Sequence, residues 1–301
     1  MDLPNADLLK IINDKICTKY PDTGIYRTNL TYLYISRFNT PRFVYRHFIH
    51  PTFAVFLING YKTLGEIGEQ KISLAPGSSI VGNLFLPVSL YLTQCSRQNP
   101  IIAVNVPLFK PYISEVLSHF PTEKTENTLI NKTHTAECTG EELSALLSLL
   151  LLCDQEENTV KYGYELALKE LYYYMLQGKH GNFIRGIFTG SLRNHRLLEV
   201  INYLSKHYKD NPNVKELADK AFMSTSNFYR CFEEITSLSP LQYVKRLRLY
   251  EGRRLILTEK HSVSQAAHNV GYLSRTQFSV DYTKIFGHSP QEDRTPHTNT
   301  N

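Results

Sequence analysis

Two short stretches of the sequence carry side chains that could read base edges in the major groove of DNA. Arg230 could donate two hydrogen bonds to guanine O6 and N7, Gln277 could bind adenine, and Val280 offers only an apolar contact, as to a thymine methyl. The candidate base-reading residues of the first stretch are Ser224, Thr225, Ser226, Tyr229 and Arg230. Those of the second are Ser274, Arg275, Thr276, Gln277 and Val280. Such a function requires that each group be presented together on one helix face.

The elements around these residues follow one two-helix design that occurs twice, at 214–232 and 263–282. Each copy has an apolar start, a Leu-Ala or Ala-Ala pair, a short turn, a Ser and a new helical face. Small Ala residues let two short helices cross closely, and Ser is a preferred N-cap. Aromatic residues four apart mark the core face of each second helix: Phe228 and Phe232, then Phe278 and Tyr282. The pattern predicts helix-turn-helix motifs at about 214–235 and 262–285, whose second helices enter the groove.

The segment between the motifs, 239–257, predicts a single spacer helix. About 18 residues span roughly 27 Å, close to the roughly 34–36 Å between successive major grooves on one face of B-DNA. Lys245 and Arg246 are the candidates for phosphate contacts from this helix. For these two and for Arg248, Arg253 and Arg254, pairing with the protein's own acids and a solvated charge on the helix surface remain the alternatives.

These stretches resemble the C-terminal domain of the AraC family of transcription regulators. The resemblance is carried by TSLSPLQYVKRLRL, residues 236–249, and by VGYLSRTQFSVDYTKIFGHSP, residues 270–290. It implies an all-α DNA-binding domain of seven helices over 195–293. It also implies double-stranded promoter or operator DNA and RNA polymerase as partners.

Four residues depart from the family's pattern. Phe222 and Ser237 stand where its turns have Gly, so these turns must be built differently or be strained. Gly252 replaces a usual Ala in the spacer helix, at a cost of about 1 kcal/mol. Val280 stands where the recognition helix of the second motif, here called the second reader, usually has Arg. We therefore expect the recognition helix of the first motif, the first reader, to contribute more to DNA binding than the second reader.

The charge of the chain accompanies the double motif. The whole chain has a net charge of +5, but residues 1–181 carry 16 basic and 17 acidic side chains, a net of −1. Residues 182–301 carry the other 17 basic and 11 acidic ones, a net of +6. Phosphate binding requires such an excess. A solvated basic face is the alternative.

Cysteine content and hydropathy indicate a cytoplasmic protein. Five cysteines, an odd number without a C-x-x-C pair, favour a reducing compartment and no disulfides. The longest run of large apolar residues, Leu146–Leu152, is far shorter than a membrane span of roughly 18 residues. No signal peptide opens the sequence, and no membrane association is expected.

Residues 20–115 have the texture of a small sheet domain. Short β-branched or aromatic runs separated by Gly, Pro and Asn predict strands within 31–38, 52–60, 71–76, 79–85, 88–94 and 101–106. Such strands without intervening helices predict a β-sandwich or jelly-roll barrel. Residues 50–106 resemble the cupin-like N-terminal domain of one AraC-family subgroup. The overall prediction is therefore an α+β chain: a cupin-like β-barrel, a helical connector and an all-α double helix-turn-helix domain.

The sheet domain lacks the residue patterns of a catalytic or metal site. His47 and His50 are three apart, so on a strand they point to opposite faces, and no Ser-His-Asp set or phosphate loop is evident. We expect no metal and no cofactor. The many aromatic residues could form plain core or a cage for a small molecule whose contacts the sequence does not identify. Cys95 beside Arg97 could be a thiol of lowered pKa, or an inert buried one.

Residues 139–182 predict two helices that connect the domains. Thr139 and Glu142 form a capping-box pattern ahead of an apolar run. Its leucines recur at three- and four-residue spacing: Leu143, Leu146, Leu147, Leu150 and Leu151. This stripe could pack on the barrel or form a dimer interface.

The sequence as a whole predicts a cytoplasmic, sequence-specific transcriptional regulator that is not an enzyme. We expect an activator that is a homodimer and responds to a small molecule or a partner. One alternative is a cupin-type enzyme or metal-binding protein with an accessory DNA-binding module. Another is a DNA-repair methyltransferase with an AraC-type module, but no cysteine lies in the strongly basic stretch that it needs.

Overall fold

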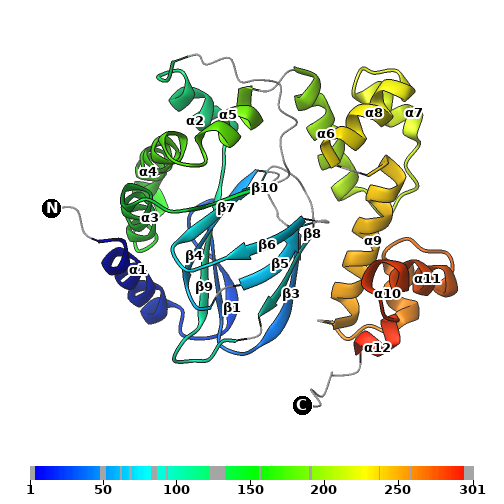
Figure 1. The fold of residues 1–301 in the computed structure, drawn as a ribbon, viewed down its shortest axis with the longest axis horizontal. Coiled ribbons are helices and arrows are strands. Elements are labelled where there is room, and N and C mark those ends of the chain that lie inside the picture. Colours follow the sequence, from blue (N-terminus) through cyan, green and yellow to red (C-terminus); the bar gives the residue numbers. More distant parts are fainter. Residues whose placement is uncertain are drawn as a thin grey trace. The chain divides into compact units, whose positions relative to one another are not determined.

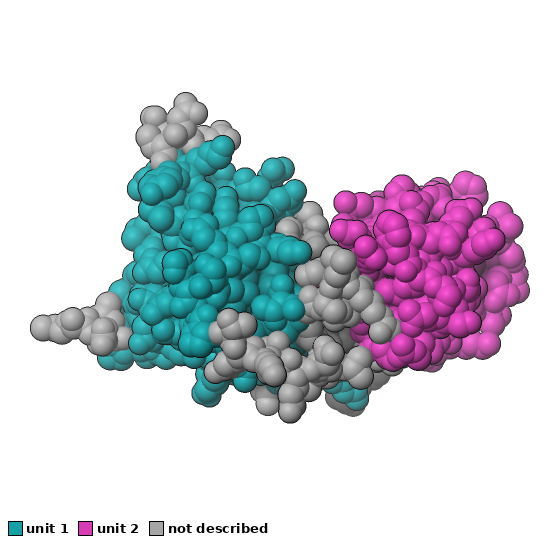
Figure 2. All heavy atoms as spheres, turned by 90° about the horizontal axis from the view of Figure 1, so that it is seen from above, with its two compact units in different colours: residues 1–191 teal, residues 192–301 magenta. Residues whose placement is uncertain are grey.

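The chain contains helices and antiparallel sheets, and it divides into two compact units (Figure 1). The computed structural model describes residues 4–47, 52–61, 63–67, 70–82, 87–92, 94–121, 133–155, 157–189, 192–236, 238–257 and 259–294. Unit 1 is Met1–Ser191 and unit 2 is Leu192–Asn301 (Figure 2). The predicted connector, 139–182, lies within unit 1. Within the described ranges, no helix has both the length and the apolar composition that crossing a bilayer requires.

Unit 1 contains two antiparallel sheets. Across the larger sheet the order is β1 (Gly24–Arg27), β2 (Tyr34–Phe38), β9 (Ile101–Pro107), β4 (Phe53–Asn59), β7 (Ser78–Gly82) and β10 (Thr133–Glu137). Across the smaller it is β3 (Arg42–His47), β8 (Pro87–Leu92), β5 (Thr63–Ile67) and β6 (Gln70–Leu74). Each of the six predicted runs overlaps a strand. Among the described residues, no strand pairing joins the two sheets. The sheet prediction is therefore confirmed, but the structure does not show a closed barrel.

Strand β4, in the middle of the larger sheet, has an almost continuous apolar sequence, without the alternation of polar and apolar residues that a strand with one solvated face shows. It is flanked by β9 and β7, with Phe56 opposite Val104 of β9 and Val55 opposite Ile80 of β7. Phe56 belongs to the core cluster that lies against the helices of unit 1, whereas Phe53 and Leu57 are buried outside that cluster. Because both faces of the strand are covered, it reads as a continuous apolar run.

Five helices complete unit 1, and three of them contribute most to its core. They are α1 (Asn5–Lys19), α2 (Lys110–Leu117), α3 (Gly140–Leu152), α4 (Glu157–Gln177) and α5 (Gly181–Thr189). Helices α1, α3 and α4 lie along one side of the larger sheet (Figure 1) and share one core cluster with strands β4 and β9. The predicted capping box is present, since Thr139 and Glu142 each accept a hydrogen bond from the other's backbone N–H.

The predicted leucine stripe is not available for dimerisation. The side chains that define it, Leu143, Leu146 and Leu150, are buried in the core of unit 1 together with Leu149. Leu147 is partly buried against the same core, and only Leu151 is largely exposed. The dimer-interface interpretation of this stripe is therefore wrong. A helix face this apolar reflects its burial between the sheet, α1 and α4.

In its described residues, unit 2 contains helices joined by turns and loops, without strands. They are α6 (Leu192–Lys206), α7 (Val214–Lys220), α8 (Thr225–Thr236), α9 (Pro240–Leu257), α10 (Val263–Asn269), α11 (Arg275–Phe286) and α12 (Pro290–Arg294). The predicted spacer helix is α9, whose 18 residues agree with the expected length. Phe278 and Tyr282 of α11 are fully buried with Leu249 and Ile256 of α9. Recognition helix and spacer therefore share one core.

Gly252 of the spacer helix makes room for an aromatic ring. A Cβ at this position would lie 2.7 Å from Cε2 and 2.8 Å from Cζ of the buried Phe278. The expected cost of this Gly in a helix therefore has a packing reason: only Gly lets α9 and the ring approach so closely.

We expect Gly252→Ala to lower the free energy of unfolding of unit 2. Overpacking a tight core costs about 1–3 kcal/mol, which outweighs the gain of about 1 kcal/mol in helix propensity. The matched control is Gly163→Ala in α4, where the new Cβ would be 3.4 Å from Leu152 Cδ2, an ordinary contact. Urea unfolding of both variants checks this, and stabilisation by Gly252→Ala would contradict it.

Candidate nucleic-acid interface

The first helix-turn-helix is formed by α7, a tight turn and α8. Ser224 lies at the N-terminus of α8, and its Oγ accepts the backbone N–H of Asn227 at 3.4 Å. The turn has the hydrogen bonds of a Schellman motif: Met223 N–H donates to the Ala218 carbonyl and Phe222 N–H to the Asp219 carbonyl, both at 3.0 Å. This places Phe222 in the left-handed position, with φ +56°.

The second helix-turn-helix, α10 and α11, uses the same turn with the usual residue. Tyr272 N–H donates to the Ala267 carbonyl at 2.9 Å and Gly271 N–H to the His268 carbonyl at 3.0 Å, and Gly271 has φ +88°. The departure at Phe222 therefore does not change how the first turn is built. It leaves a strain of about 1–2 kcal/mol at a non-Gly residue. Ser237, the other departure, lies outside the described residues.

The predicted base-reading residues lie at the surface of their two helices. Thr225, Ser226 and Arg230 of α8 are exposed and Tyr229 is half-buried, whereas Phe228 and Phe232 are buried as predicted. On α11 the exposed predicted residues are Arg275, Thr276, Gln277 and Val280. Ser274 N-caps α11 by accepting the N–H of Gln277. Each motif thus presents one polar face, as groove binding requires.

The guanidinium of Arg230 is oriented by two neighbours on its own helix. One terminal nitrogen forms an ion pair with Glu234, one turn further along α8, and the other donates to Asn227 Oδ1 at 3.0 Å. These contacts hold the fork at the surface before any partner arrives. Sequence reasoning missed Glu234, although its i,i+4 spacing from Arg230 is a recognisable signal for such a pair.

Most spacer cations with described contacts serve the fold. Arg248 donates to the carbonyl oxygens of Tyr208, Lys209 and Asp210 beyond the end of α6. Arg253, buried, pairs with Asp293 at 2.7 Å, and Arg254 pairs with Glu251 and Glu259. For Arg253 and Arg254 the alternative of pairing with the protein's own acids is confirmed, whereas among the described residues Arg248 donates hydrogen bonds to backbone carbonyl oxygens and to Asn211, not to acids. Arg246 is half-buried, and its phosphate contact remains a prediction.

Unit 1 brings together a serine and two histidines that sequence reasoning did not connect. Ser79 Oγ lies 2.8 Å from His180 Nε2, and His180 Nδ1 lies 2.9 Å from His134 Nδ1. Burial, with a smaller contribution from His134, lowers the pKa of His180 to about 4, so its imidazole is neutral at physiological pH. Ser79 and His180 are both fully buried. A substrate could not reach this serine, and the cluster instead satisfies polar groups of the core.

The thiol candidate of unit 1 does not have the lowered pKa that a reactive cysteine would need. Burial raises the pKa of Cys95 in spite of nearby Arg42, so the lowered-pKa alternative is wrong. Arg97 lies near Asp22, with 3.9 Å between Nη2 and Oδ1. All five cysteines are unpaired thiols. His50 and the side chain of His47 lie outside the described residues, so the argument from their spacing remains a prediction.

Two relatives match between about a third and a half of this chain. The probable transcriptional regulator LumQ of Photobacterium leiognathi is 35% identical over 91 residues, which is 30% of this chain and 37% of LumQ. The transcriptional activator RhaS of an Enterobacter strain is 28% identical over 141 residues, 46% of this chain and 49% of RhaS. The matches thus span about a third to a half of these relatives.

Solved structures of one protein match most of the chain. ToxT of Vibrio cholerae in an apo variant form is 15% identical with a TM-score of 0.56, over 88% of this chain and 98% of ToxT. Wild-type ToxT bound to an unsaturated fatty acid gives 14% identity and a TM-score of 0.55, over 89% and 96%. At this identity the likeness shows the fold.

Two family descriptions match the chain, one in each unit. Residues 217–295 match a helix-turn-helix domain, which includes both motifs described above. Residues 29–183, just over half of the chain, match the N-terminus of AraC-type transcriptional regulators. The chain therefore belongs to the AraC family of transcriptional regulators.

Proposed function

We propose that this protein binds double-stranded DNA sequence-specifically and regulates transcription. The observation that carries the proposal is the pair of helix-turn-helix motifs, whose turns have the same hydrogen bonds. Both motifs pack on the α9 spacer, the first through Phe232 against Tyr243 and the second through a shared core, and both present polar side chains outward. A spacer of 18 residues is about 27 Å long. That length suits two recognition helices in successive major grooves.

The regulatory part of the proposal concerns unit 1. Its match to the N-terminus of AraC-type regulators supports a cupin-like barrel that receives a signal. ToxT, which shares the fold, has been solved with an unsaturated fatty acid, and we propose that unit 1 likewise responds to a small organic molecule. RhaS is an activator. Activation through RNA polymerase, a homodimeric state and a cytoplasmic location complete the proposal.

The first reader should contribute more to specificity than the second. Arg230→Ala is expected to weaken binding to a selected duplex by about 1–3 kcal/mol and to relax the preference for one guanine. Val280→Ala should weaken binding much less, because its side chain can make only an apolar contact. Fluorescence anisotropy on duplexes selected from a randomised library, with each base pair substituted in turn, measures both effects for the intact chain.

Two results of this experiment would count against the proposal. If the wild-type chain selects no preferred sequence and its affinity does not fall with salt, it is not a sequence-specific DNA-binding protein. If Val280→Ala costs as much as Arg230→Ala, the DNA-binding function stands but the dominance of the first reader is wrong. Circular dichroism of both variants provides the control for folding.

A further inference from the structure

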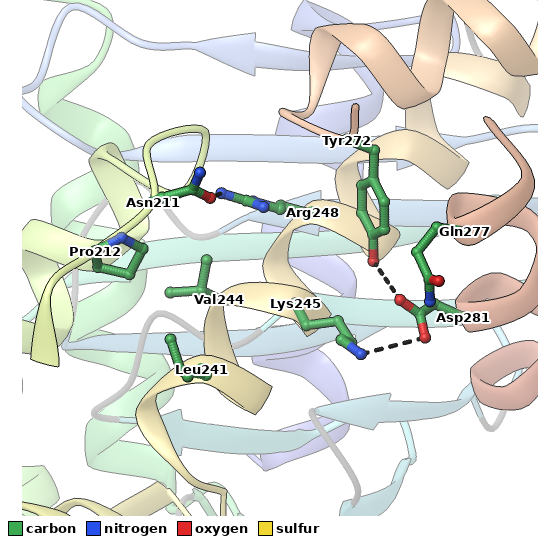
Figure 3. A pocket seen from close by; sticks show the side chains of 9 residues that line it. All are labelled: Asn211, Pro212, Leu241, Val244, Lys245, Arg248, Tyr272, Gln277 and Asp281. Atoms are coloured by element: carbon green, nitrogen blue, oxygen red, sulfur yellow. Dashed lines mark hydrogen bonds and ion pairs between the residues drawn. The ribbon is translucent and has the colours of Figure 1, made fainter. Parts of the chain in front are cut away.

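A pocket opens in unit 2 between the start of the first motif, the spacer helix and the second motif (Figure 3). Its volume is about 340 Å³. Its lining residues are Asn211, Pro212, Leu241, Val244, Lys245, Arg248, Tyr272, Gln277 and Asp281. Two of these, Lys245 and Gln277, are predicted DNA-contacting residues. The pocket therefore places the second reader and a spacer cation around one group of side chains.

Asp281 is the charged centre of this group. It lies on α11 with only 5% of the residue exposed, yet it carries a carboxylate. Lys245 Nζ of α9 donates to its Oδ1 and Tyr272 Oη, from the turn before α11, donates to its Oδ2, both at 3.2 Å. A buried charge is tolerated only with such partners. The carboxylate thus ties the second recognition helix to the spacer helix and to its own turn.

Gln277 lies one helical turn before Asp281 on α11 and lines the same pocket, and its amide lies beside the Asp281 carboxylate (Figure 3). Burial by itself would raise the pKa of Asp281, but hydrogen bonds from Gln277, Lys245 and Tyr272 outweigh it and the pKa lies below its ordinary value. A Gln amide has two N–H donors and one carbonyl oxygen. With one N–H on Asp281, the other N–H and the oxygen remain for adenine N7 and N6. The carboxylate therefore fixes which way the amide faces.

The first motif has no carboxylate at the position equivalent to Asp281. Aligning the core aromatic pairs places Cys231 of α8, just before Phe232, at the position of Asp281, just before Tyr282. Cys231 is a buried thiol whose Sγ donates to Oδ1 of Asn227, the residue aligned with Gln277, at 3.4 Å. The equivalent pair is therefore in contact in both motifs, but a charged centre with partners on the spacer helix and in the turn is found in the second motif.

We propose that Asp281 is a positioning residue that sets the base preference of the second recognition helix by orienting Gln277, and that Lys245 serves Asp281 and not a DNA phosphate. This rests on the proposed function. The side chain of Lys245 is 49% exposed, so its exposure is compatible with the phosphate contact that the sequence suggested. Its ammonium nevertheless lies on the carboxylate, which would lose its one cationic partner among the described residues if Lys245 turned away.

The test compares four variants of the intact chain: Gln277→Ala, Asp281→Asn, Tyr272→Phe and Lys245→Met. Gln277→Ala identifies the base pair that the second reader recognises. Asp281→Asn and Lys245→Met should then relax preference at that same base pair about fivefold or more, and leave the guanine preference of Arg230 unchanged. The slope of log Kobs against log salt should be unchanged in Lys245→Met, whereas loss of a phosphate contact would reduce its magnitude by about 0.9.

Each outcome decides between the two roles. A reduced salt slope in Lys245→Met with an unchanged base preference would overturn the inference and leave the proposed function intact. No effect of Asp281→Asn at the base pair found with Gln277→Ala would also overturn it. If Asp281→Asn does not fold, Tyr272→Phe, which removes one donor and no charge, must still relax that base pair. A wild-type chain without any sequence preference would instead refute the proposed function itself.

Discussion

Replacing Leu146 and Leu150 together with Glu is expected to unfold unit 1. Both leucines are buried in the core that α3 shares with α1, α4 and the larger sheet. Truncating one buried leucine costs about 2–5 kcal/mol, and placing an unpaired carboxylate in its site costs several kcal/mol more. Two such changes exceed the total stability of about 5–15 kcal/mol that a domain has.

Leu146→Ala measures quantitatively how much the burial of this leucine stabilises unit 1, and Leu151→Ala is its matched control. Leu151 lies on the same helix but is 52% exposed, so its truncation should change the free energy of unfolding by no more than about 0.5 kcal/mol. Urea unfolding of unit 1, followed by far-UV circular dichroism, measures both. Equal small effects would show that Leu146 is not a core residue, and a dimer interface on this stripe would again be tenable.

Dimerisation has to be tested on side chains that the fold leaves exposed. Leu151 of α3 and Leu166 of α4 are about half exposed, and Tyr162 of α4 is more exposed still. These residues come from the two helices that the sequence suggested for an interface. Sedimentation of a Leu151→Glu, Leu166→Glu variant therefore probes association without disturbing the core.

The sequence predicted unit 2 well because its signals are local. Ser N-caps, aromatic pairs four residues apart and the i,i+4 face of a helix all lie within a dozen residues of each other, and α7 to α11 occur where they were expected. The sheet was predicted less completely. Strand β1 has only four residues and β10, THTAE, is largely polar, so neither stands out, and β5 contains a Gly. Their existence depends on partners far away in the sequence.

For the candidate site, too, features set by local sequence could be predicted, whereas contacts between distant residues could not. Which residues face outward on α8 and α11 could be read from periodicity, because the core aromatics fix the opposite face. The partners of the charged residues, with few exceptions, could not be predicted from periodicity. Lys245 is 36 residues from Asp281 and Arg253 is 40 from Asp293, and nothing in a local pattern connects them. The leucine stripe failed for a related reason: periodicity shows that a face is buried, but not whether its own chain or another copy buries it.

A second long-range contact, at the start of α3, is expected to make the stability of unit 1 depend on pH. Glu142 forms the capping box with Thr139, but it is also buried, and Gly178 at the end of α4 lies over it. A Cβ at Gly178 would be 2.8 Å from Glu142 Oε1. Burial raises the pKa of Glu142 to about 7, against the opposing hydrogen bond from the Thr139 N–H. The capping pattern was visible in the sequence, whereas the burial was not.

Glu142→Gln is therefore expected to remove a pH dependence from the stability of unit 1. Because the folded pKa is raised above that of the unfolded chain, the contribution of Glu142 is fully present below about pH 4.3 and is lost as the pH rises through about 7. At about 1.4 kcal/mol per pKa unit, the loss amounts to roughly 3 kcal/mol. Gln keeps the capping acceptor and stays neutral.

The free energy of unfolding of Glu142→Gln relative to wild type should thus rise by this amount between pH 4.5 and pH 8 in urea titrations. Other titrating groups, including His180 with its lowered pKa, are present in both proteins and cancel in the difference. Glu141→Gln is the control, because Glu141 lies in the same helical turn but is exposed. Its pKa is lowered, and the largest cause is a hydrogen bond with its own backbone. That variant should show no such rise. A difference between Glu142→Gln and wild type that does not change with pH would mean that the carboxyl group ionises in the folded protein as it does in water, and that α4 does not exclude solvent from it.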